Sequence, residues 1–204
     1  MSILQNLFGS RKTAALEVYG KLPFYQDYIA VLSTADGVAW KSWLLGFAGR
    51  QGVRLPPGRW LFLFRRTRKS PLTAGIIEPS SDGIREFPFS LFVSLDGIKT
   101  RLLPAAALTT WRLLLKERGA LDGVSSIDQC YQQIRGRQLL LEPAKEEQNP
   151  QLAAALGATP DGNRPLFLIC APNRSGPIQP LVWQGSESVF MAKWSALPGA
   201  ETPD

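Results

Sequence analysis

The sequence of 204 residues contains no histidine, and this absence excludes several kinds of chemistry. Histidine cannot activate a serine or cysteine nucleophile here, and imidazole cannot ligate a metal. Cysteine is almost as scarce, because only Cys130 and Cys170 are present, far apart and outside any C-x-x-C pattern. Both cysteines fall in apolar patterns, which favours reduced thiols in the core. We therefore predict that the protein binds no metal and no cofactor.

Long apolar runs are also missing. No run approaches the roughly 20 residues that a membrane-spanning helix needs. Residues 1–8 lack the basic start and the long apolar stretch of a signal peptide, although the apolar side chains of residues 3, 4, 7 and 8 follow helical spacing. We interpret this segment as a docked terminal turn, and we expect a cytoplasmic protein without a membrane span.

The charge is basic, with a net charge of +6 and an isoelectric point of about 9.6. Such a balance invites a nucleic-acid partner. The densest basic run, residues 65–69, contains no interleaved aromatic residue, and acidic residues are spread through the rest of the chain. We therefore predict that the protein does not bind nucleic acid.

Apolar residues make up 45% of the chain, which is enough for one core. We predict a single domain over residues 1–197, with a motif-bearing part at about 15–95, a part made of helices and strands at about 100–197, and a disordered tail at 198–204. The pattern predicts strands at 15–19, 60–64, 72–77, 87–95, 164–170, 181–183 and 188–194. Three of them follow one another closely between residues 60 and 95, which favours an antiparallel meander. Residues 20–35 read as an irregular crossover.

Helices are predicted between the groups of strands. Asp36 suits the N-cap of a helix with apolar residues at 40, 43, 44 and 47 and an exit at Gly49. Pro104 suits the first turn of a second helix, which carries a stripe at residues 108, 111, 115 and 118 and ends at Gly119. Ser126 and Gln129 form a capping box for a third helix, and a short fourth helix covers 150–157. Helices between strand groups cover both faces of a sheet. We predict an α/β fold, a three-layer α/β/α sandwich with a mixed, mainly antiparallel central sheet.

Two segments crowd polar residues among apolar and turn-forming residues, residues 20–29 and 79–89. Turn chemistry explains these residue types without any function, and an exposed ion pair between Asp82 and Arg85 would contribute only ~0–1 kcal/mol. In the functional interpretation, the polar side chains of the two segments form an oriented cluster that binds a partner. A hydrolase with Ser80 or Ser81 as nucleophile and Lys21 as base is a further alternative.

The same two segments and the residues between them resemble the TagF family, also called ImpM, which is associated with bacterial type VI secretion systems. The family carries Gly-Lys-Leu-Pro followed by Gly-Asp-Phe; residues 20–23 keep the first motif, and residues 26–28 read Gln-Asp-Tyr. A tryptophan-rich helix, a Trp-x-Phe strand, a Pro-Ser-x-Asp segment and a closing Phe-Pro follow in the family, and this sequence matches them at residues 40–44, 60–62, 79–82 and 87–88. The order and spacing make the resemblance specific over about 15–95. The chain departs from the pattern at Gln26, which replaces a glycine, and before Arg85, where one residue and a glycine are missing.

The resemblance implies a cytoplasmic accessory protein that restrains type VI secretion after translation. It implies a protein partner, linked in the family to the forkhead-associated scaffold protein, with no catalysis and no cofactor. A structural or adaptor subunit that does not repress is the alternative, and a phosphate-bearing ligand lacks support because no glycine-rich phosphate loop is present.

Both motif segments follow a predicted strand, so they can emerge at one edge of the sheet. We predict that they lie side by side and form one partner-binding site, with Lys21, Asp27, Ser80, Asp82 and Arg85 as its residues.

Overall fold

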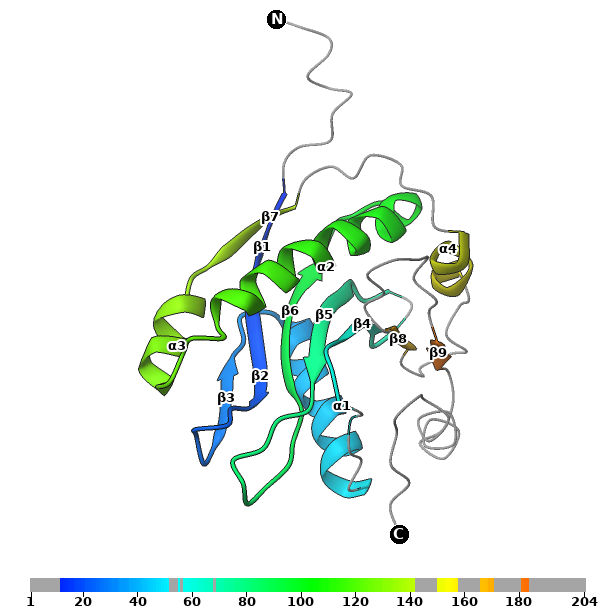
Figure 1. Ribbon diagram of the computed structural model, residues 1–204. Helices are drawn as coiled ribbons and strands as arrows, with labels where there is room; N and C mark the ends of the chain where they lie inside the picture. The colour runs from blue at the N-terminus through cyan, green and yellow to red at the C-terminus, as the bar shows by residue number, and fades with distance from the viewer. Residues whose placement is uncertain are drawn as a thin grey trace, which may run out of the picture.

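The computed structural model describes residues 12–51, 55, 57–67, 69–141, 150–157, 166–170 and 181–183. They form a large β-sheet that carries helices on its faces (Figure 1). The predicted terminal turn at 3–8, the predicted strand at 188–194 and the predicted tail at 198–204 lie outside the described residues. Among the described helices, none has the length and apolar character needed to cross a membrane.

The strands are β1 (Lys12–Ala15), β2 (Glu17–Lys21), β3 (Tyr28–Val31), β4 (Trp60–Arg65), β5 (Leu72–Glu78), β6 (Phe89–Leu95), β7 (Gln138–Leu141), β8 (Leu166–Cys170) and β9 (Leu181–Trp183). Seven of them form one sheet in the order β3-β2-β6-β5-β4-β8-β9, and β1 pairs with β7 in a separate ribbon. Every pair of described strands is antiparallel, so the parallel pairing expected in a mixed sheet does not occur among them. The predicted meander of β4, β5 and β6 is confirmed.

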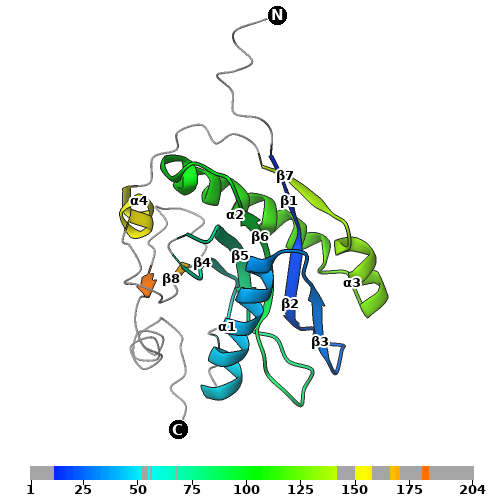
Figure 2. The ribbon, with the colours of Figure 1, turned by 180° about the vertical axis from the view of Figure 1, so that it is seen from behind.

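The helices are α1 (Ala35–Gln51), a 3₁₀ turn η2 (Thr100–Leu102), α2 (Leu103–Ala120), α3 (Ile127–Ile134) and α4 (Pro150–Gly157). Together with the antiparallel sheet they make the chain an α/β protein. Helix α2 lies in front of the sheet in Figure 1, and α1 lies behind it; Figure 2 shows the same arrangement from the back.

Helix α2 packs on the sheet face that carries Val18, Ile76 and Leu91, all of which are fully buried. Trp111 of α2 lies in the same cluster, and its indole N–H donates to the backbone oxygen of Phe62 at 3.1 Å. This bond satisfies the one polar atom of a buried tryptophan. The apolar stripe predicted for this helix is therefore its core-facing side.

The opposite face is packed by aromatic rings from α1 and the sheet. Trp40 is completely buried and stacks on Phe62, with ring centroids 4.1 Å apart. Gly75 leaves room for this stack, because a Cβ there would lie 2.2 Å from the Phe62 ring. The Trp40 indole donates to the Ser90 hydroxyl at 3.0 Å, which donates in turn to the Tyr19 carbonyl at 2.7 Å. The predicted helix face at residues 40–47 is thus confirmed as a core face.

The prediction of an irregular crossover over residues 20–35 was wrong, because it contains strand β3. This strand is short, and its residues alternate between exposure at Tyr28 and complete burial at Ile29. The first predicted strand, 15–19, is divided in the structure. Strand β1 ends at Ala15, β2 begins at Glu17, and Leu16 between them belongs to neither strand. Strand β7 was not predicted; it is held by its pairing with β1, a contact that local sequence does not reveal.

The ends of α1 differ from the prediction. The N-cap is Thr34 and not Asp36, since the Thr34 hydroxyl accepts a bond from the Gly37 N–H at 2.9 Å. The helix runs through Gly49 and ends at Gln51. A single glycine within a helix weakens it but does not have to end it.

The starts of the later helices agree with the prediction. Pro104 occupies the first turn of α2, and Pro150 opens α4. The Ser126 hydroxyl accepts a bond from the Gln129 N–H at 3.3 Å, which caps α3. The Gln129 side chain returns to the N–H of Ser125 at 3.2 Å, one residue earlier than in the standard capping box.

Candidate functional site

The two motif segments form neighbouring loops at one end of the sheet. Residues 22–27 connect β2 to β3, and residues 79–88 connect β5 to β6; both loops project in the same direction in Figures 1 and 2. Their proximity follows from the strand order, because β2 pairs with β3 on one side and with β6 on the other. The Lys21 N–H extends the second pairing to the Pro88 carbonyl at 3.4 Å.

A buried ion pair joins the two loops. The Nζ atom of Lys21 lies 2.5 Å from Oδ2 of Asp82, and the two side chains are only 1% and 6% exposed. The same ammonium donates to the carbonyl oxygens of Tyr25, at 2.8 Å, and of Gln26. A buried charge is tolerated when it is paired and its remaining donors are satisfied. Lys21 meets both conditions, so it fixes the shape of its own loop and the position of the other.

Asp82 also organises the loop that contains it. Its second oxygen, Oδ1, accepts bonds from the backbone N–H groups of Ile84 at 3.0 Å and Arg85 at 2.7 Å. The Lys21 ammonium and these N–H groups hold the pKa of the Asp82 carboxyl well below its ordinary range. The turn is closed by a β-bridge between Ser81 and Glu86.

Arg85 reaches across to the first loop, where its guanidinium donates to the Gln26 carbonyl. Two cations, from Lys21 and Arg85, thus converge on one backbone oxygen. Gln26 contributes this oxygen through its main chain, so the contact does not require a particular side chain at the position.

The structure thus brings Lys21, Asp82 and Arg85 together and leaves the other two predicted residues outside their contacts. Asp27 is exposed and makes no hydrogen bond or ion pair within the described part of the chain. The Ser80 hydroxyl is buried without a hydrogen-bond partner among the described residues, while its carbonyl accepts from the Phe87 N–H at 2.9 Å. Because Lys21 faces three other oxygens, the geometry does not support a base for a serine nucleophile.

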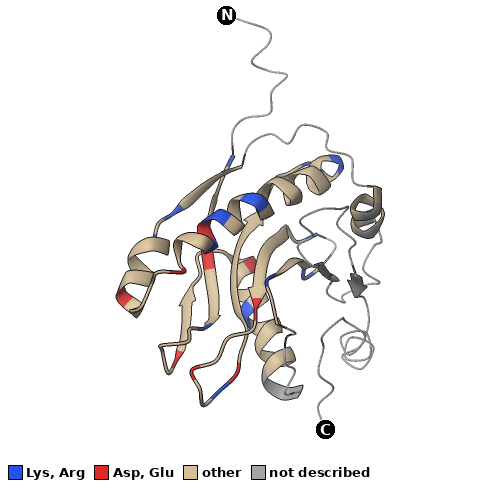
Figure 3. Cartoon of the chain, viewed as in Figure 1, with Lys and Arg blue, Asp and Glu red and all other residues tan. Residues whose placement is uncertain are grey.

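Exposed apolar residues on the two loops and at the start of β3 were not predicted. Ile84 is 82% exposed at the tip of its loop, and Phe24 and Tyr28 are 41% and 38% exposed. The Tyr28 ring packs edge-on against Phe87, with ring centroids 4.7 Å apart. Figure 3 shows that both loops also carry charged residues. The sequence does contain one sign of this exposure, because Ile84 is an apolar residue that follows Asp82-Gly83 inside a predicted turn.

The structure explains why the Gly-Lys-Leu-Pro motif begins with a glycine, Gly20. Its φ is +142°, and a Cβ at this position would lie 2.1 Å from the Pro88 carbonyl oxygen. Only glycine allows this backbone conformation and this close approach of the two strands. The motif residue therefore sets the distance between the loops.

A second polar cluster ties α2 to the sheet. Glu78 accepts from Arg118 at 2.5 and 2.7 Å and from Arg59 at 3.1 Å, and both arginines also bond Asp122. Because its charges are mutually paired, this cluster has the features of a structural network. In the described ranges, no group of three or more Cys, Asp or Glu side chains is arranged to hold a metal ion.

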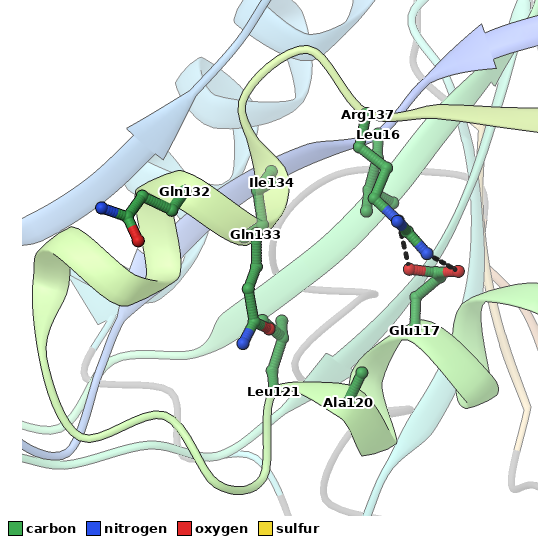
Figure 4. A pocket seen from close by; sticks show the side chains of 8 residues that line it. All are labelled: Leu16, Glu117, Ala120, Leu121, Gln132, Gln133, Ile134 and Arg137. Carbon is green, nitrogen blue, oxygen red and sulfur yellow. Dashed lines mark hydrogen bonds and ion pairs between the residues drawn. The ribbon is translucent and has the colours of Figure 1, made fainter.

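An open cavity of about 260 Å³ lies between the end of α2 and the connection from α3 to β7 (Figure 4). Leu16, Leu121 and Ile134 form part of its lining. Its two charged residues bind each other, since Arg137 donates to Glu117 through two bonds of 2.7 and 2.9 Å. The cavity therefore offers no free charge to select a ligand.

Comparisons with known proteins find similarity in structure but not in sequence. No protein family model matches this chain, and no curated protein matches it. The crystal structure of PA0076 from Pseudomonas aeruginosa PAO1 is similar, with a TM-score of 0.59 and 16% sequence identity. The match covers 93% of this chain and 97% of that chain. At this level of identity the two proteins share a fold, and the likeness extends over nearly their full length.

Proposed function

We propose that this chain is a cytoplasmic accessory protein of a bacterial type VI secretion system that restrains secretion after translation by binding a protein. The observation that carries the proposal is the convergence of Lys21, Asp82 and Arg85. These residues belong to the motifs that resemble the TagF family, and they are distant in sequence. Their contacts hold the β2–β3 loop and the β5–β6 loop together as one surface.

In this proposal the partner binds the paired loops. Lys21 and Asp82 hold the surface in shape, while the exposed side chains of Asp27 and Arg85 are available to contact the partner, with Ser80 beneath the turn. A rigid loop loses little conformational entropy on binding. The partner proposed from the resemblance is the forkhead-associated scaffold protein of the same system. The scaffold for the loops is a three-layer α/β/α domain, and no catalysis or cofactor is invoked.

Deletion and overproduction of the gene test the repressor function. Deletion should raise the release of the tube protein of the secretion system, and overproduction should lower it. The levels of the tube protein inside the cells should stay constant, since the restraint acts after translation. Loss of secretion on deletion would show that the protein is a structural adaptor instead.

A further inference from the structure

The tip of the β5–β6 loop is a turn that satisfies its own backbone donors. The Oδ1 atom of Asp82 accepts bonds from the N–H groups of Ile84 and Arg85, at 3.0 and 2.7 Å. The Ser81 hydroxyl accepts a bond from the Gly83 N–H at 3.0 Å, and the Asp82 N–H donates to the Arg85 carbonyl at 3.4 Å. Four consecutive N–H groups are therefore bonded within the turn, and a partner cannot use them as donors without breaking it.

Contacts on both sides of this turn fix its shape. The other carboxylate oxygen of Asp82 is paired with the buried ammonium of Lys21, and Ser81 is joined to Glu86 by a β-bridge. Gly83 has a φ of +86°, a left-handed conformation that glycine adopts without strain. A turn that is held in one shape has less conformational entropy to lose when a partner binds.

The side chain of Ile84 projects from this turn into solvent. It is 82% exposed, more than any other large apolar residue in the described ranges. Turn positions commonly hold Gly, Pro, Asn, Asp or Ser, each of which favours the turn for a backbone reason, and isoleucine supplies none of these reasons. Since the backbone donors around Ile84 are used internally, its apolar side chain is the group that it offers to a partner.

The charges around Ile84 indicate which kind of surface it meets. Arg85 and Glu86, which follow it in the chain, are exposed and opposite in sign, and Asp27 on the neighbouring loop is exposed as well. An anionic membrane attracts clusters of basic residues. A mixture of both signs around an apolar side chain instead favours a protein surface, where an apolar pocket has a polar rim.

We propose that Ile84 is the anchor of the interface and inserts into an apolar pocket of the protein partner, with Arg85 and Glu86 at the rim. This inference rests on the proposed function, and it adds the kind of surface that the partner presents. A side chain that fills a pocket near the centre of an interface carries a large share of the binding energy, while charged contacts at the rim contribute less. The pocket matches an isoleucine side chain in size and carries no charge.

The test varies the size of the side chain at this position. Ile84→Val removes one methylene and Ile84→Trp adds a large apolar ring, and neither change should affect folding because Ile84 is exposed. The purified forkhead-associated scaffold protein is titrated into each variant by calorimetry. Ile84→Val should weaken binding by about fourfold, the value of one buried methylene. Ile84→Trp should weaken it by about tenfold or more, because a pocket of fixed size is overfilled.

Two comparisons separate a pocket from a flat apolar surface. A flat surface would bind Ile84→Trp more tightly than the wild type, since more apolar area is buried. Val38→Trp is the matched control, because it adds the same ring at an exposed position on α1. This control should bind like the wild type. Unchanged or tighter binding by Ile84→Trp would overturn the inference.

Nuclear magnetic resonance of the wild type with methyl-labelled isoleucine gives a readout that does not depend on the binding of a variant. The Ile84 methyl signal, which is assigned by its loss in Ile84→Val, should be broadened by a soluble nitroxide in the free protein and protected in the complex. If the wild type binds while this methyl group stays accessible, Ile84 is not the anchor, although the proposed function stands. If the scaffold protein does not bind the wild type, the proposed partner and this inference both fail.

Two other results would assign Ile84 to a different surface. Sedimentation with vesicles of phosphatidylcholine and phosphatidylglycerol that is lost in Ile84→Ser would show that the tip binds membranes. A dimeric wild type that Ile84→Ser converts to a monomer would show that the tip binds a second copy of this chain. Either result would overturn the inference.

Discussion

The ammonium of Lys21 in β2 and the carboxylate of Asp82 in the β5–β6 loop form a buried pair 2.5 Å apart. The pair connects two segments that are far apart in the chain and that both carry motifs resembling those of the TagF family. Each member is held by further bonds: Lys21 by carbonyl oxygens of its own loop and Asp82 by N–H groups of its own turn. Neither side chain can be removed without leaving the other charge unpaired.

The first prediction concerns the pH dependence of stability. The pKa of Asp82 is lowered in the folded protein, mainly by its bond to Lys21. At pH below the ordinary aspartate value of about 3.9, the unfolded chain takes up a proton that the folded chain does not. The stability that the pair contributes is therefore complete above that pH and declines as the pH falls toward the lowered pKa. Urea unfolding of the wild type at several acidic pH values should show this decline.

The Asp82→Asn variant is the control for this experiment, because other carboxyl groups titrate in the same range. Its free energy of unfolding should be lower than that of the wild type at neutral pH. The difference between the two proteins should shrink as the pH falls below about 4. A difference that is constant with pH would mean that the carboxylate charge does not stabilise the fold.

The second prediction concerns Gly20. Gly20→Ala forces a side chain into a conformation with φ of +142° and places its Cβ 2.1 Å from the Pro88 oxygen. Gly58→Ala is a matched control, since Gly58 has φ of +118° but no atom lies within 4 Å of the place that its Cβ would occupy. The control should lose about 1–3 kcal/mol of unfolding free energy from backbone strain. Gly20→Ala should lose clearly more, measured by denaturant unfolding; equal losses would show that the two strands can separate without penalty.

The third prediction concerns Cys130, which is 1% exposed in the α2-side core. Burial raises the pKa of its thiol to about 11, so little thiolate is present at mildly alkaline pH. Iodoacetamide should label Cys130 at least about a hundredfold more slowly in the native protein than in guanidinium chloride, because labelling requires opening of the core. Mass spectrometry of the Cys130 peptide measures the two rates. Rapid native labelling would show that α3 detaches readily from the sheet.

The sequence could predict those features that depend on nearby residues. The apolar stripes of α1 and α2, the meander from Trp60 to Leu95 and the cap at Ser126 each follow from local periodicity or local hydrogen bonding, and each is present. Strand β3 could not be predicted in the same way. Its stability comes from pairing with β2, and its four residues carry too little pattern to stand out among the turn residues around them.

The site could be predicted in part for a related reason. Because each motif segment follows a predicted strand, the sequence could predict that Lys21 lies near Asp82, but it did not show that both side chains would be buried. Turn chemistry and function use the same residue types, so the sequence could not assign Asp82 to shaping the loop. The exposure of Ile84 depends on that loop shape and could be recognised only after folding.

The last prediction tests whether Ile84, at the exposed tip of the β5–β6 loop, contributes to partner binding without contributing to the stability of the fold. Ile84 is 82% exposed, so Ile84→Ser removes few internal contacts and should change the free energy of unfolding by no more than about 0.5 kcal/mol. If Ile84 anchors the partner, the same change should weaken partner binding by about 2 kcal/mol and relieve repression of secretion in the cell.

Val38→Ser provides the matched control for this last experiment, because Val38 is 52% exposed on α1, in a different part of the chain. It also removes an exposed β-branched apolar side chain, so it should leave both stability and repression unchanged. Tube-protein release is measured in a deletion strain complemented with each variant at equal expression. Full repression by Ile84→Ser would show that the partner does not use the apolar tip. Loss of repression by both variants would instead indicate a general sensitivity to surface polarity, and the loops would then have no special part in binding.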